Sequence, residues 1–292
     1  MGNVKVVTEI PEQAGHFEWE GHRIAYTSYG EGERTVVLVH GLLLSQKMHL
    51  PLAREIARRG YRAITLDVLG HGASERPRDM TQYSMAQFGR QTVALLDAIG
   101  VDDAVILGTS LGANTALEAA VLAPHRIRGM VIEMPVLDNA LLGCAIAFTP
   151  AMAAMSFGER PMRLLGAALK AVPTRRIWAA DFVLDVIRQD PRPSAAVLNG
   201  LFFGEVAPHR DVRRTITTKT LVIGHRRDPV HPFSDALALA EEIKGASFIE
   251  ASSILELRLA PKRLTGEICN FVDDCFAPRK AARKAAARRK AA

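Results

Sequence analysis

The feature that most constrains the fold of this 292-residue chain is a series of short apolar runs rich in β-branched residues. Such continuous runs are typical of strands buried on both faces of a parallel sheet. Stretches with helical periodicity separate them, and this alternation predicts an α/β fold with a doubly wound, mostly parallel sheet. The predicted strands lie at 35–39, 61–66, 104–107, 130–132 and 220–223, and the predicted helices between them at 49–59, 84–99 and 111–123.

The two ends of this pattern predict further elements. Residues 15–20 and 22–29 flank Glu20-Gly21 and predict an antiparallel hairpin at the sheet edge. Toward the C-terminus, the sequence predicts a helix at 237–243, a last strand at 246–249 and a closing helix at 261–276 with a proline in its first turn.

Between Pro135 and about His209, Ala- and Met-rich helical segments interrupted by prolines replace the alternation. We expect a helical cap inserted into the sheet domain. Residues 139–158 carry no charge, a length that raises the question of a membrane span. Because the strands on both sides would have to stay in one compartment, a buried or lid helix is the favoured interpretation. The expected organisation is a first part of the core at 1–135, a cap at 136–209, a second part of the core at 210–277 and a disordered basic tail at 278–292.

The net charge of +6 is concentrated in that tail, which holds seven Lys/Arg and no acidic residue. Without those seven charges the remainder carries −1, so only the tail has the electrostatic footprint of a polyanion-binding segment. We expect either a weak contact of 278–292 with polyanions or anionic lipid, or a solvated terminus without a function. Nothing in the sequence indicates the oligomeric state.

The cysteines and the N-terminus bear on the compartment. Cys144, Cys269 and Cys275 have neither the spacing of a zinc site nor the even number of a disulfide framework. The first residues lack a basic start followed by an apolar run, so no secretory signal is visible. The expectation is a cytoplasmic protein without a metal or organic cofactor.

Gly108-Thr-Ser110-Leu-Gly112 lies between a predicted strand and a predicted helix. This is the context of a nucleophile elbow, a sharp turn that exposes a serine hydroxyl and leaves no room for side chains at the two glycines. His40-Gly41 ends the strand 35–39. The amide of Leu42 in this loop and the amide of Leu111, directly after the serine, would form an oxyanion hole. His40 is expected to orient this loop rather than to act in catalysis.

With the turn Asp67-Val-Leu-Gly-His-Gly-Ala-Ser74, these motifs resemble the α/β-hydrolase superfamily, in its branch of esterases, meta-cleavage-product hydrolases and non-haem peroxidases. The resemblance covers 16–135 well and 215–275 loosely. It implies an α/β-hydrolase fold, and the serine at 110 excludes the dehalogenases and epoxide hydrolases that use an aspartate nucleophile. It also implies that Asp228, just after the strand 220–223, is the acid of a catalytic triad.

The chain departs from the family at the third member of the triad. The family's histidine would fall at about 253–256, but no histidine follows His231. One interpretation is that His231 swings in from the acid's own loop. A second is that Glu256, His71 or His40 serves as the base, and a third is that the chain keeps the pocket but not the proton relay.

The sequence therefore predicts a serine hydrolase that cleaves a carboxylic ester, or a related acyl or C–C bond, of a lipophilic small molecule. The predicted catalytic residues are Ser110, Asp228 and His231. The alternative is a catalytically impaired binding protein with the same fold.

Overall fold

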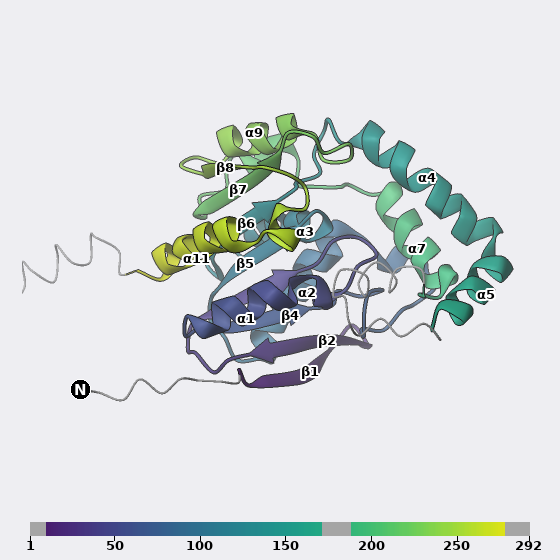
Figure 1. Cartoon of the computed structure of the whole chain (residues 1–292), viewed down its shortest axis with the longest axis horizontal. Coiled ribbons are helices and arrows are strands. Elements are labelled where there is room, and N and C mark those ends of the chain that lie inside the picture. The colour runs from purple at the N-terminus through teal and green to yellow at the C-terminus, as the bar shows by residue number, and fades with distance from the viewer. Residues whose placement is uncertain (1–9, 171–187, 278–292) are drawn as a thin grey trace, which may run out of the picture.

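The computed structural model describes residues 10–170 and 188–277. They form an eight-stranded sheet of order β1-β2-β4-β3-β5-β6-β7-β8 with helices on both faces (Figure 1). Only β2 pairs in the antiparallel sense, with β1 and β4, so the predicted mostly parallel sheet is confirmed. The strands are β1 (Glu12–Trp19), β2 (His22–Tyr29), β3 (Thr35–Val39), β4 (Arg62–Leu66), β5 (Ala104–Thr109), β6 (Ile127–Glu133), β7 (Thr220–His225) and β8 (Ser247–Ala251).

The predicted hairpin at the sheet edge is present as β1 and β2. Trp19 pairs with His22, and the two residues between them, Glu20 and Gly21, have φ angles of 49° and 80°. Positive φ at both central residues is the requirement of a type I′ turn, whose twist matches that of the flanking strands.

The central strands are buried because helices cover both faces of the sheet. Along β3, Val37 and Val39 belong to one core cluster, and Val36 and Leu38 belong to the other. This alternation follows the two-residue period of a strand. One cluster packs against α2 (Met85–Ala98), α3 (Leu111–Leu122) and α9 (Phe233–Glu242), and the other against α1 (Leu50–Arg58) and α11 (Lys262–Phe276).

Local signals account for where helices α2 and α9 begin. The Ser84 hydroxyl accepts a hydrogen bond from the Gln87 amide and caps α2. Helix α9 begins at Phe233, four residues before the predicted start, directly after Pro232. The short elements η1 (Gln46–His49), η2 (Met80–Gln82), α8 (Arg210–Arg213) and α10 (Glu256–Leu259) were not expected from the sequence.

The chain leaves the sheet after β6 and returns to it at β7. In between, α4 (Leu141–Phe157), α5 (Glu159–Lys170) and α7 (Pro191–Phe202) arch beside the sheet, at the right of Figure 1. These helices fall inside the predicted cap at 136–209, although the division of the chain into core and cap stays a prediction. Residues 171–187 of the cap and the predicted disordered tail at 278–292 lie outside the described residues.

Among the described helices, none is by itself both long and apolar enough to cross a bilayer. Helix α4 and the segment Arg160–Leu169 meet the criteria of length and composition only together, with a bend of 92° between them.

Candidate active site

Ser110 lies on the sharp turn between β5 and α3. Its φ and ψ of 55° and −114° are rare for a residue with a side chain, and its amide donates to the Glu133 carbonyl at 2.9 Å. A Cβ atom at Gly108 would overlap the Gly112 carbonyl, and one at Gly112 would overlap the Val39 carbonyl. The two glycines are therefore needed for the close backbone contacts that hold the serine in this conformation.

A single loop after β7 brings Asp228 and His231 to the serine. The His231 Nε2 atom lies 2.8 Å from the Ser110 hydroxyl oxygen, and its Nδ1 atom lies 2.8 Å from Asp228 Oδ2. The side chain of His231 is 15% exposed and that of Asp228 is 5% exposed. The structure thus joins the three predicted catalytic residues in one hydrogen-bonded chain, while their catalytic roles stay a prediction.

The Asp228 carboxylate is held in its ionised form. Burial alone would raise its pKa, but the hydrogen bond and charge of His231 and the amides of Val230 and His231 bring the pKa below its ordinary value. Both amides donate to Oδ1 at 2.9 Å, so the carboxylate fixes the backbone of the residue whose ring it binds. An ionised Asp228 favours the His231 tautomer with its proton on Nδ1, which leaves Nε2 free to accept from the serine.

The two predicted oxyanion donors border the same cavity as Ser110. Leu42 follows β3, and Leu111 is the first residue of α3, where a backbone amide has no acceptor within the helix. Gly41 lies close to the elbow, since a Cβ placed on it would be 3.8 Å from the Ser110 Cβ. Donation of these two amides to an oxyanion stays a prediction.

His40 and His71, the other histidines considered as bases, bind backbone groups. His40 is fully buried, its Nδ1 lies 2.8 Å from the Gly41 carbonyl, and its Nε2 accepts from the Val68 amide at 3.3 Å. Burial lowers the pKa of His40, which agrees with a neutral ring that donates through Nδ1. The His71 Nδ1 lies 3.0 Å from the Leu69 carbonyl. Both rings are therefore engaged in holding loops.

Glu256, the remaining candidate base, is also bound elsewhere. Its carboxylate accepts hydrogen bonds from the Arg263 guanidinium at 2.8 Å and from the Ser252 amide and hydroxyl at 2.6 and 2.7 Å. The hydrogen bonds of Arg263 and Ser252 lower the pKa of Glu256 to about 2. A carboxylate so stabilised in its ionised form is a poor proton acceptor.

An ion pair behind the elbow had not been predicted. Arg258 binds Glu133 at 2.8 Å and the Thr109 hydroxyl at 3.1 Å, and the two charged side chains are 7% and 1% exposed. Thr109 precedes the serine, and the Glu133 carbonyl accepts a hydrogen bond from the serine amide. The Arg258–Glu133 pair therefore stabilises the residues that contact the elbow. The polar residues at the ends of β5 and β6 were the only signal for it in the sequence.

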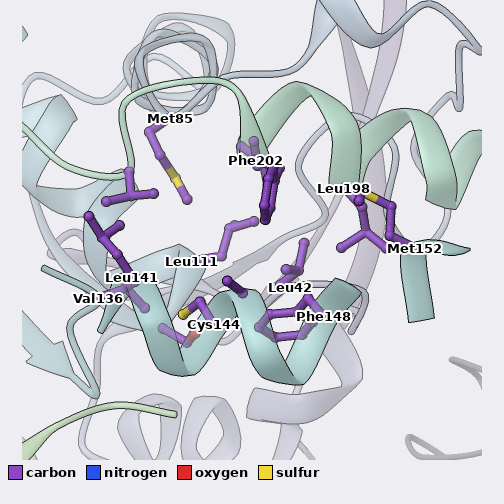
Figure 2. Close-up of a pocket in the computed structure, with 14 residues that line it drawn as sticks. Leu42, Met85, Leu111, Val136, Leu141, Cys144, Phe148, Met152, Leu198 and Phe202 are labelled. Carbon is purple, nitrogen blue, oxygen red and sulfur yellow. The ribbon is translucent and has the colours of Figure 1, made fainter. Parts of the chain in front are cut away.

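A cavity of about 280 Å³ lies above Ser110, between the elbow and the helices of the insertion (Figure 2). Its walls are almost entirely apolar. The lining residues are Leu42, Met85, Ser110, Leu111, Val136, Leu141, Cys144, Ala145, Phe148, Met152, Leu198, Leu201, Phe202 and Val206. Within residues 10–170 and 188–277, no cluster of His, Cys, Asp and Glu could hold a metal ion.

Comparisons with known proteins agree with this architecture. The chain is 30% identical over 195 residues to a 2-hydroxymuconate semialdehyde hydrolase of Pseudomonas putida, a match that covers 63% of this chain and 66% of the relative. It is 25% identical over 258 residues to a putative non-heme haloperoxidase of Mycobacterium phage D29, covering 85% and 90% of the two chains.

Among solved structures, Est816, described as an N-acyl homoserine lactone degrading enzyme, matches with a TM-score of 0.68 and 26% identity over 88% of this chain and 100% of the other. The enol-lactonase of Burkholderia xenovorans LB400 matches with a TM-score of 0.71 and 20% identity over 89% of this chain and 100% of the other. At this identity, the match shows only that the two folds are alike. A family model described as alpha/beta hydrolase fold matches residues 34–244. The chain therefore belongs to the α/β-hydrolase fold family.

Proposed function

We propose that this chain is a serine hydrolase that cleaves a carboxylic ester, or a related acyl or C–C bond, of a lipophilic small molecule. The observation that carries the proposal is the hydrogen-bond distance of 2.8 Å between His231 Nε2 and the Ser110 hydroxyl oxygen. A serine is a weak nucleophile until an adjacent base accepts its proton, and this contact provides such a base.

The first half of the reaction is acylation of Ser110. The serine oxygen attacks the carbonyl carbon of the ester while His231 Nε2 takes the hydroxyl proton. Asp228 keeps the histidine ring in place and stabilises the imidazolium that forms. When the tetrahedral intermediate collapses, the ester C–O bond breaks and the imidazolium gives its proton to the departing alcohol.

The second half returns the enzyme to its starting state. A water molecule attacks the acyl-serine as His231 accepts its proton, and the acid product leaves when that proton passes back to the serine oxygen. In both halves, the carbonyl oxygen develops negative charge, which the amides of Leu42 and Leu111 would stabilise. An apolar cavity strengthens these interactions because it excludes water from the reacting atoms.

The name of the Pseudomonas putida relative, a 2-hydroxymuconate semialdehyde hydrolase, supports hydrolysis, but the names of the relatives do not agree on a substrate. The alternative is a non-catalytic binding role, which rests on the absence of a histidine at 252–258. In the proposed relay, His231 takes the place of the histidine that the family has there. A cytoplasmic location and a contact of 278–292 with polyanions are proposals that rest on the sequence alone.

The proposal is tested by reacting the full chain with a fluorophosphonate probe and with p-nitrophenyl butyrate. We expect labelling of Ser110 and turnover of the ester, and we expect Ser110→Ala to abolish labelling and to lower kcat about 10³-fold or more. The melting temperature should change little, because the substitution removes only a hydroxyl. Ester turnover within a few fold of the original in Ser110→Ala would overturn the proposal.

A further inference from the structure

The described walls of the cavity next to Ser110 offer a substrate almost no polar partner. Among its fourteen described lining residues, only Ser110 and Cys144 carry a hydrogen-bond donor in the side chain. Figure 2 shows Leu42 and Leu111 in the middle of the cavity, with Val136 and Leu141 toward one end and Met152 and Leu198 toward the other. A molecule bound across the serine therefore meets apolar surface on both sides.

Cys144 does not change this character. Burial raises the pKa of its thiol to about 11, so the group is neutral near pH 7. Its sulfur lies 4.0 Å from the Val230 carbonyl, a weak contact at most. The thiol can neither pair with a cation nor compete with a charged donor for an anion.

Two polar side chains just outside the described wall, Asn114 and Asp235, are already engaged in hydrogen bonds. The amide of Asn114, fully buried, donates to the carbonyls of Val136 and Val206 and accepts from the Val136 amide at 3.1 Å. The Asp235 carboxylate accepts from the backbone amides of Leu137, Asn139 and Ala140. These side chains fix the segments that line the cavity and do not offer their charges or donors to its interior.

The size of the cavity limits the substrate. Cavities that bind small molecules typically measure about 300–1,000 Å³. At about 280 Å³, this cavity lies at the lower end of that range, which favours an ester with short groups on both sides of its carboxyl.

We propose that this cavity selects small neutral esters whose acyl and alcohol groups are both apolar, and that it rejects esters that carry a carboxylate. This inference rests on the proposed function, because it assigns the substrate class of the same site. An ionised carboxylate in this cavity would lose its hydration without gaining a partner among the described lining residues. By contrast, each additional methylene group of a substrate that enters the cavity strengthens binding about fourfold.

The test compares two esters with the same acyl chain length, ethyl hexanoate and monoethyl adipate, which differ in a terminal carboxylate. For the full chain, kcat/KM for ethyl hexanoate should exceed that for monoethyl adipate by about a hundredfold or more. Comparable values for the two esters would overturn the inference.

Two matched variants on α4 locate the selection in this cavity. Ala145 lines the cavity, whereas Ala147 is exposed on the outer face of the same helix. Ala145→Phe should lower kcat/KM for ethyl hexanoate about tenfold or more, because the added ring fills space that the acyl chain needs. Ala147→Phe should leave this value unchanged. Equal effects of the two variants would contradict the assignment.

A binding measurement separates this inference from the proposed function. In the Ser110→Ala protein, 2-octanone should raise the melting temperature by about 2 °C or more, whereas 7-oxooctanoate at the same concentration should not. If the original chain showed neither fluorophosphonate labelling nor ester turnover, the proposed function would be wrong. An equal rise in melting temperature with the ketone and with the keto acid would instead show that the inferred selection for neutral groups is wrong.

Discussion

At the scale of single residues, the candidate relay depends on the loop that follows β7. Asp228 Oδ1 accepts hydrogen bonds from the backbone amides of Val230 and His231. These bonds turn the chain around the carboxylate, so that the ring of His231, three residues later, contacts Oδ2. Pro229 and Pro232 restrict the backbone on either side of His231. The acid and the base of the proposed triad therefore share one rigid loop.

Asp228→Asn tests the role of the acid. The amide oxygen of asparagine can still accept from the two backbone amides, but its NH2 group would face His231 Nδ1 and favour the opposite tautomer. We expect kcat for p-nitrophenyl butyrate to fall by about 10⁴-fold. The control is Asp211→Asn, a change at a side chain that is 78% exposed. A fall of less than tenfold in Asp228→Asn would show that the carboxylate does not orient the base.

At the scale of elements, the insertion holds the loop that contains Leu42. Gln189, just before α7, donates from Nε2 to the Leu43 carbonyl at 2.8 Å and accepts from Arg76, whose guanidinium also binds the Gly70 carbonyl. Leu43 has a φ of 58°, which is strained for a residue with a side chain. The hydrogen bond from Gln189 stabilises this conformation and fixes the Leu43–Leu44 peptide, two peptide units after the one that carries the proposed oxyanion donor.

Gln189→Leu tests this link between the insertion and the site. The substitution keeps the approximate volume but removes the donor, so the loop should relax and the Leu42 amide should move from its position. We expect kcat to fall about tenfold with a change in KM of less than about threefold, because the lost stabilisation acts in the transition state. The matched control is Gln13→Leu at an exposed position of β1. A change in KM alone would mean that Gln189 serves only to shape the cavity.

At the scale of the whole molecule, the site and the end of α11 lie on opposite sides. Figure 1 shows α4, α5 and α7 at the right and the C-terminal end of α11 at the left. The cationic segment 278–292 follows α11 in the sequence. Binding of polyanions by this segment should therefore be independent of catalysis.

Truncation after Phe276 tests this independence. We expect the salt-dependent affinity for heparin to be lost, since the remaining chain is near neutral, while kcat/KM for p-nitrophenyl butyrate stays within about twofold. Elution from a heparin column and ester kinetics measure the two effects. Heparin affinity that survives the truncation would place the binding site on the folded body.

The sequence predicted the fold and most element positions because apolar runs and helical periodicity report burial directly. The strands that precede the elbow and Asp228 were predictable for the same reason, whereas the choice of Asp228 as the acid came from the family resemblance and stays a prediction. His231 was one of three open interpretations, because the direction of its ring depends on loop torsions that no pattern reports.

The contacts of Arg258 with Glu133 and of Gln189 with Leu43 join residues 125 and 146 positions apart. Such long-range side-chain pairs have no periodic signature in one sequence. They became visible only when the fold had placed the segments side by side.

The most direct test of the proposed relay is the rate at which a fluorophosphonate labels Ser110 in His231→Gln, compared with the original chain and with His209→Gln. His209 is 78% exposed and serves as the control. We predict that labelling and ester turnover fall by about 10³-fold or more in His231→Gln and stay within about twofold in His209→Gln. Labelling of His231→Gln at the rate of the original chain would contradict the assignment of His231 as the base.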